Sequence, residues 1–80
     1  MRLTYTANAR KQLTRLPRRV QERVVKAVSY IELNPYSGKK LLGELSGRYS
    51  YRVWPYRIIY TVDGTNIYVT NISHRQGVYK

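Results

Sequence analysis

The first part of the chain carries its apolar residues at two different spacings. Residues 1–6 alternate apolar and polar side chains, a pattern typical of a strand. From there to residue 31, apolar residues recur every three or four positions, which indicates helix. Pro17 interrupts this run, and proline suits the first turn of a new helix better than the interior of an existing one. The pattern therefore predicts a helical hairpin with helices over residues 7–15 and 17–34.

The last part of the chain alternates in the manner of strands. Residues 48–54, 56–62 and 66–73 place apolar and polar side chains in turn. An Asp-Gly dipeptide, a common two-residue hairpin connection, separates the last two of these segments. The intervening residues 39–47 are basic and punctuated by glycine, and they predict a linker whose leucines pack against the core.

The order strand, helix, helix, strand, strand, strand predicts an α+β fold. In this fold a small twisted antiparallel sheet packs on the N-terminal helical hairpin. Because the apolar stripes of the helices bury one face of the sheet, the other face is left open to solvent or to a ligand. The chain has 80 residues, which predicts one domain spanning residues 1–80 and leaves no room for a second.

Strand alternation predicts which side chains lie on the open face. Arg48, Ser50 and Arg52 alternate with the more apolar side chains of their strand, and Arg57 does so in the next strand. Arg75 follows the third strand. Arginines that only solvate an exposed sheet are one explanation. Their convergence on one face also suits phosphate, whose oxygens match the planar guanidinium group.

The charge of the chain favours a polyanionic partner. It contains 15 Lys and Arg residues against 4 Asp and Glu, a formal net charge of +11, while 42% of its residues are hydrophobic. The composition is therefore that of a folded basic domain, for which nucleic acid or the ribosome is the expected partner.

Composition also excludes several kinds of site. The chain has no cysteine and one histidine, and its four carboxylates are scattered, which excludes disulfides and thiol catalysis and predicts neither a metal nor a cofactor. Its apolar runs are far shorter than the roughly 18–20 residues of a membrane span, and its first residues lack the features of a signal peptide. We therefore expect a cytoplasmic protein without a membrane partner.

Three segments of the chain resemble the RelE/ParE superfamily of toxins from type II toxin–antitoxin modules. They are YSYRV at residues 49–53, YRIIY at 56–60 and ISHRQGVY at 72–79. The resemblance is closest to the RelE-like mRNA interferases, and it implies the same fold as the pattern analysis. It also implies a ribosome-dependent endoribonuclease that inhibits translation by cleaving mRNA, with an acidic antitoxin as protein partner.

The resemblance further implies roles for four residues. Arg57 matches the family arginine that contacts the reacting phosphate, and Arg75 matches the one that stabilises the transition state or the leaving group. Tyr79 matches the tyrosine that stacks on a base or assists proton transfer. Arg52 stands where RelE has the second of two catalytic lysines.

Four further residues are predicted to contact RNA: Arg48, Ser50, His74 and Lys80. Ser50 stands where RelE has the other catalytic lysine, so that one charge is missing, and either Arg48 or Lys39 is a candidate to replace it. As the single histidine, His74 is the one side chain of the type that acts as a general base near neutral pH. A structural or RNA-contacting role is favoured, because His74 is adjacent to Arg75 and points to the opposite face if the strand continues.

Two other functions fit the same features. A ParE-like toxin that poisons DNA gyrase shares the fold and does not need the arginines and tyrosine named above. A non-catalytic RNA- or DNA-binding module would use the same basic face without any reaction.

Overall fold

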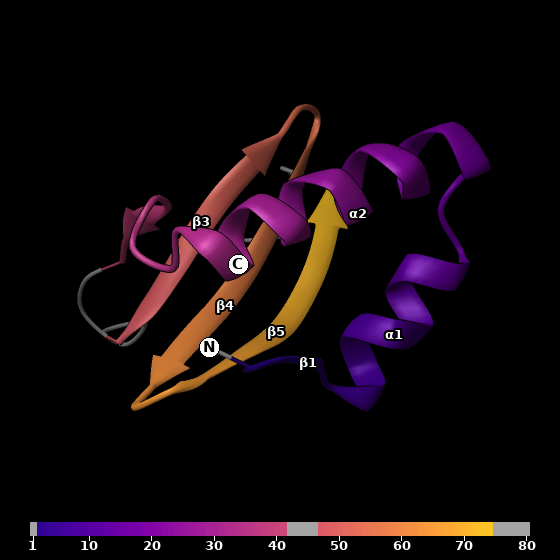
Figure 1. The fold of residues 1–80 in the computed structure, drawn as a ribbon. Coiled ribbons are helices and arrows are strands. Elements are labelled where there is room, and N and C mark those ends of the chain that lie inside the picture. The colour runs from indigo at the N-terminus through magenta and orange to yellow at the C-terminus, as the bar shows by residue number, and fades with distance from the viewer. Residues whose placement is uncertain (1, 42–46, 75–80) are drawn as a thin grey trace.

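The computed structural model describes residues 2–41 and 47–74 of the chain (Figure 1). Its elements, in chain order, are β1 (Arg2–Tyr5), α1 (Ala7–Thr14), α2 (Arg18–Leu33), β2 (Lys39–Lys40), β3 (Arg48–Val53), β4 (Tyr56–Asp63) and β5 (Asn66–His74). Both predicted helices and all three predicted C-terminal strands are present. The α+β class is confirmed.

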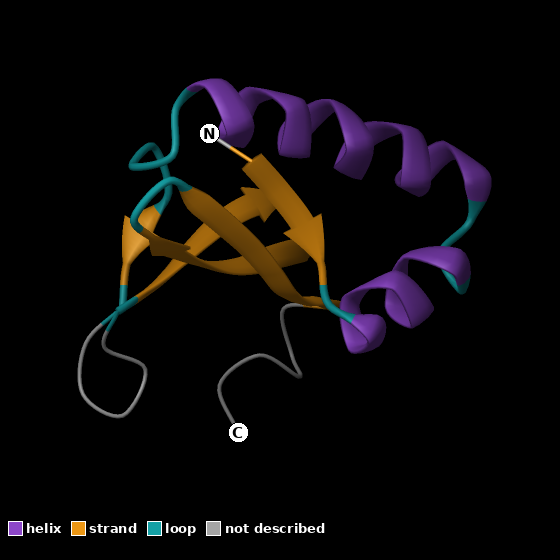
Figure 2. Ribbon diagram, turned by 60° about the horizontal axis from the view of Figure 1, so that its bottom comes forward, coloured by secondary structure: helices purple, strands orange, loops and turns teal. Residues whose placement is uncertain are grey.

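One face of the sheet is covered by helix, as the apolar patterns predict. Figure 2 shows α2 along one side of the twisted sheet, while α1 packs where β1 and β5 lie together. The buried core joins both layers and consists of Ala9, Val24, Val28, Ile31, Val53, Ile58, Tyr60, Ile67, Val69 and Ile72. Since the helical hairpin provides Ala9 and three residues of α2, its apolar stripe is what closes this face of the sheet.

The sheet is mixed, whereas the sequence pattern predicted an antiparallel one. Its strand order is β1-β5-β4-β3-β2, and β1 pairs with β5 in parallel while the other neighbours are antiparallel. The chain reverses twice between β3 and β5, so β5 runs in the direction of β3. Alternation along β1 shows which face its side chains take, but it contains no information about which strand lies beside it or in which direction.

The segment predicted as a linker contains an additional short strand. Lys39 and Lys40 form β2, which pairs with β3 so that Lys39 lies opposite Ser50 and Lys40 opposite Tyr49. Two residues are too few to show an alternating pattern. Leu41 is buried, as predicted for the leucines of this segment. The other leucines, at positions 42 and 45, lie outside the described residues.

A β-bulge in β5 changes which side chains face the core. Ile59 lies opposite Asn71 but Tyr60 lies opposite Val69, so Thr70 is an extra residue on β5. As a result Val69 and Ile72 are both buried although they are three residues apart.

Thr6 and two residues of α1 form hydrogen bonds with the backbone at this bulge. The carbonyl oxygen of Thr70 accepts hydrogen bonds from Thr6 Oγ1 at 3.3 Å and from Asn8 Nδ2 at 3.2 Å. The backbone N–H of Ile72 donates to Gln12 Oε1 at 2.6 Å. Backbone groups of β5 beyond the end of its pairing with β1 therefore find partners on Thr6 and on α1.

Candidate functional site

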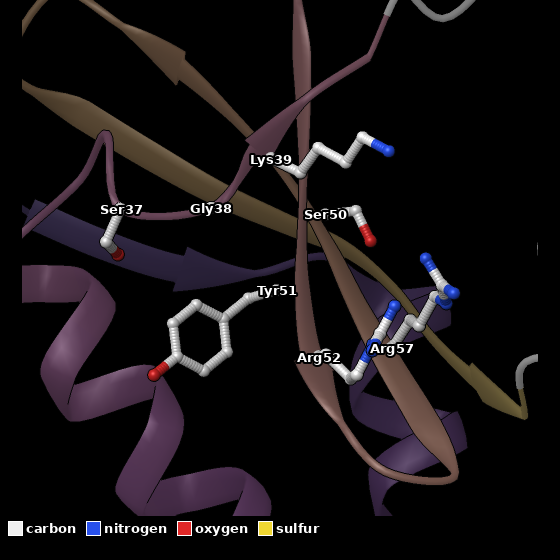
Figure 3. Close-up of a pocket in the computed structure, with 7 residues that line it drawn as sticks. All are labelled: Ser37, Gly38, Lys39, Ser50, Tyr51, Arg52 and Arg57. Atoms are coloured by element: carbon white, nitrogen blue, oxygen red, sulfur yellow. The ribbon is translucent and has the colours of Figure 1, made fainter.

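A hollow on the open part of the sheet gathers positively charged side chains. Its volume is about 360 Å³, and it is lined by Ser37, Gly38, Lys39, Ser50, Tyr51, Arg52 and Arg57 (Figure 3). These residues come from the loop after α2 and from β2, β3 and β4. Three of the seven are cations and none is a carboxylate, so the hollow has the electrostatic character of an anion site.

Strand pairing brings the two arginines together. Arg52 lies directly opposite Arg57, and Arg57 lies opposite Ser73 on its other side. Like charges at directly opposed sheet positions destabilise the sheet. A bound anion relieves that repulsion, and a phosphate group can take two parallel N–H bonds from a guanidinium.

The side chains of the hollow divide between the two sides of β3. In Figure 3, Lys39, Ser50, Arg52 and Arg57 project to one side, while the Tyr51 ring turns toward α2. There it meets the ring of Tyr30, with 6.0 Å between the ring centroids. Ser50, Arg52 and Arg57 thus share one side, as strand alternation predicted, and Lys39 lies on that side with them.

Arg52 has an aromatic neighbour that the sequence analysis did not assign to the site. Its guanidinium carbon lies 5.8 Å from the ring centroid of Trp54, which is about half exposed. The Trp54 carbonyl oxygen in turn accepts a hydrogen bond from Arg23 of α2 at 2.8 Å. A cation over an exposed indole ring is weakly held, so this contact orients Arg52 without burying its charge.

The loop that carries Ser37 and Gly38 is fastened to the core by Tyr60. The Tyr60 hydroxyl donates to the Pro35 carbonyl oxygen at 2.8 Å and accepts from the Gly38 N–H at 3.0 Å. Burial raises the pKa of this hydroxyl above 10.0, which keeps its proton available for the first of these bonds. The sequence predicts a loop at residues 34–38, but Ser37 and Gly38 were not assigned to the site because neither side chain is charged.

The residues predicted for the site fall into three groups. Arg57, Arg52 and Ser50 line the hollow together, and Ser50 is 5% exposed. Arg48 pairs with Thr61 at the far end of β3 and does not line it. The predicted residues at positions 75, 79 and 80 lie outside the described part of the chain.

The side chain of His74 lies on the opposite side of β5 from that of Ser73. It lies opposite Tyr56, and their rings meet edge to face with centroids 5.5 Å apart. Ser73 lies on the face of the sheet that carries Arg57, and His74 does not. His74 therefore faces the other side of the sheet from Arg57 and the hollow.

Two further kinds of feature are absent from residues 2–41 and 47–74. No cluster of three or more His, Cys, Asp or Glu side chains in those ranges is arranged to hold a metal ion. None of the helices there combines the length and the apolar character needed to cross a bilayer.

Comparison with known proteins identifies the family. Residues 3–79 match the family described as ParE toxin of type II toxin-antitoxin system, parDE. The chain belongs to this toxin family. It is therefore a toxin of a type II toxin–antitoxin system in the RelE/ParE superfamily, as the three sequence segments suggested.

Relatives of this toxin include a named toxin and proteins of solved structure. It is 34% identical over 80 residues to Toxin RelG of Mycobacterium tuberculosis, an alignment that covers 95% of this chain and 92% of RelG. It also matches a chain in the crystal structure of the RelBE2 toxin–antitoxin complex of the same organism, with a TM-score of 0.84 and 33% identity over 92% of this chain and 96% of that one.

More distant toxins share the fold at lower identity. The YoeB/ParE toxin from Agrobacterium tumefaciens matches with a TM-score of 0.81 at 21% identity, over 92% of this toxin and 98% of that chain. The intact RelBE toxin–antitoxin complex of E. coli matches with a TM-score of 0.77 at 21% identity, over 91% of this toxin and 94% of that chain.

Proposed function

We propose that this toxin is a ribosome-dependent endoribonuclease that acts in the cytoplasm and cleaves mRNA. The observation that carries the proposal is the hollow in which Arg52 and Arg57 lie opposite each other beside Lys39, with no carboxylate among the lining residues. The 34% identity to Toxin RelG supports it.

The proposed reaction suits a site built from arginine and lysine. The 2′-hydroxyl of one nucleotide attacks the neighbouring phosphate and the 5′-oxygen of the next nucleotide leaves, so the nucleophile is part of the substrate. The protein has to hold the RNA in line for this attack, stabilise the additional negative charge on the phosphate and manage two protons. Positioning and fixed hydrogen-bond donors are the main sources of rate in such a case. This route requires no metal ion or cofactor.

The remaining roles come from the resemblance to RelE. Arg75 is proposed to stabilise the transition state or the leaving group, and Tyr79 to stack on a base or assist proton transfer. Arg48, Ser50, His74 and Lys80 are proposed to contact RNA, Ser50 within the hollow.

An acidic antitoxin is the proposed protein partner. The related structures of M. tuberculosis RelBE2 and E. coli RelBE are toxin–antitoxin complexes. The net charge of +11 favours an acidic protein in the same role for this toxin.

Replacing Arg57 tests the proposed reaction. Arg57→Ala is expected to slow cleavage of ribosome-bound mRNA by about 10²–10³-fold under single-turnover conditions with saturating toxin, the usual effect of removing one preorganised donor. Arg10→Ala is the matched control, because Arg10 is exposed on α1 and the variant loses the same charge. Cleavage by Arg57→Ala at the rate of the control would contradict the assignment.

Inhibition of DNA gyrase is a second candidate, favoured by the ParE description of the matching family. If it is correct, the toxin inhibits supercoiling by purified gyrase and leaves ribosome-bound mRNA intact. The Arg57→Ala variant would then inhibit gyrase as strongly as the unmodified toxin.

A further inference from the structure

Two adjacent lysines of β2 lie in different environments. Lys39 pairs with Ser50 and lines the hollow, and its side chain projects to the same side as Arg52 and Arg57 (Figure 3). Lys40 pairs with Tyr49 and is not among the lining residues. Both are exposed and carry the same charge, so alternation along the strand alone distinguishes them.

Lys39 supplies a charge at the point of the hollow where β3 has none. Ser50 lies between Lys39 on one side and Ile59 on the other and is itself neutral. Arg52, two residues further along β3, faces the same side. The ammonium group at the end of a flexible stem can follow a phosphate that the two arginines hold.

The start of β2 is held in place by a buried contact. Gly38 directly precedes Lys39, and its N–H donates to the Tyr60 hydroxyl at 3.0 Å. A Cβ atom on Gly38 would lie only 2.6 Å from this hydroxyl oxygen and 3.0 Å from the Ser50 carbonyl oxygen. The backbone at Gly38 is thus pressed against both Tyr60 and β3, which limits where Lys39 can lie.

We infer that Lys39 binds an RNA phosphate in this hollow together with Arg52 and Arg57, and that the Tyr60 hydroxyl positions Lys39 by holding the loop through Gly38. The inference rests on the proposed function for the identity of the ligand as RNA. It adds a third phosphate-binding residue and a positioning residue to that site.

The adjacent lysines provide the test. The probe is a short single-stranded RNA with 2′-O-methyl groups, which removes the nucleophile, and its affinity is measured by fluorescence anisotropy over a series of salt concentrations. Lys39→Ala is expected to weaken binding and to reduce the slope of log K against log salt by about 0.7, the value for one phosphate contact on a single strand. Lys40→Ala, with the same change of net charge, is expected to leave the slope unchanged. Lys39→Arg should restore it.

The positioning role of Tyr60 is tested by a double-mutant cycle. Tyr60→Phe keeps the buried ring and loses both hydrogen bonds to the loop. It should weaken RNA binding when Lys39 is present and have no further effect in the Lys39→Ala background. An equal loss of binding in both backgrounds would overturn the positioning role.

The outcomes separate this inference from the proposed reaction. Equal effects of Lys39→Ala and Lys40→Ala on binding, or no binding of the probe by the unmodified toxin, would overturn the inference even if the toxin cleaves mRNA on ribosomes. A clear difference between the two lysine variants would support it even if no cleavage is found, in which case only the proposed reaction fails.

Discussion

Tyr60 is buried completely, and its hydroxyl both donates and accepts a hydrogen bond. Its ring stacks on Tyr49 with 5.4 Å between centroids, and Tyr49 meets the exposed Tyr36 edge to face at 5.7 Å. A row of tyrosines thus leads from the core to the loop beside the hollow. Phenylalanine could fill the buried position but could not form the two hydrogen bonds to the loop, so the hydroxyl group is what holds the loop.

The raised pKa of Tyr60 predicts a loss of stability in alkali. Since burial favours the neutral hydroxyl in the folded protein, the unfolded chain releases this proton first, near its ordinary pKa of 10.0. The contribution of the neutral Tyr60 hydroxyl to stability is complete below that pH and is lost as the pH rises through the higher pKa of the folded state. Tyr60→Phe has no such proton. At about pH 8 the free energy of unfolding, measured in urea, should be higher for the toxin than for this variant by about 1–3 kcal/mol. The reason is that the variant leaves buried polar groups of the loop without hydrogen-bond partners. At about pH 11 the difference should be smaller, and a constant difference would contradict the prediction.

At the scale of elements, the helical hairpin does more than cover the sheet. Through Thr6, Asn8 and Gln12, α1 supplies the partners of the backbone groups at the β5 bulge. The bulge places Ser73 opposite Arg57 and His74 opposite Tyr56. The hydrogen bonds between α1 and β5 thus lie directly beside the position that pairs with Arg57.

Replacing Gln12 tests this connection. Gln12→Leu should lower the free energy of unfolding by about 1–3 kcal/mol, because the Ile72 N–H loses its acceptor in a partly buried position. Gln12→Glu retains an acceptor oxygen and should lose less. Hydrogen exchange of the Ile72 amide should accelerate in the leucine variant and much less in the glutamate variant. Equal protection of this amide in both variants would show that Gln12 does not hold the bulge.

At the scale of the whole molecule, charge and exposed apolar surface occur together. The net charge is +11, and α2 and the loop after it expose Tyr30, Leu33 and Tyr36, of which Leu33 is 81% exposed. These three residues line a hollow at the C-terminal end of α2. A partner that is both acidic and amphipathic would match both features.

The proposed antitoxin should therefore bind through two kinds of contact. In calorimetric titrations its affinity should fall between low and high salt, because the charged contacts are screened, yet binding should persist because apolar contacts are less affected. The test partner is the product of the gene next to that of the toxin. Leu33→Asp is expected to weaken the part of the affinity that persists at high salt. The absence of binding at both salt concentrations would contradict the prediction.

Features that depend on residues close together in the chain could be predicted from the sequence. Apolar spacing and Pro17 located both helices, because a helix buries one stripe of side chains every three to four residues. Alternation placed Arg52 and Arg57 on one face, because successive strand residues must point to opposite sides. The roles of residues 75 and 79 came from the family resemblance and stay predictions.

Features that depend on residues far apart in the chain could not be predicted and are seen only in the folded protein. The parallel pairing of β1 with β5, the bulge at Thr70 and the position of Lys39 beside Ser50 each join segments that the pattern treats separately. The choice of Lys39 over Arg48 as the cation in the hollow follows from the pairing of β2 with β3 and from the Tyr60 contact to Gly38. Such pairings follow from how the whole chain packs around one core, and local periodicity does not encode them.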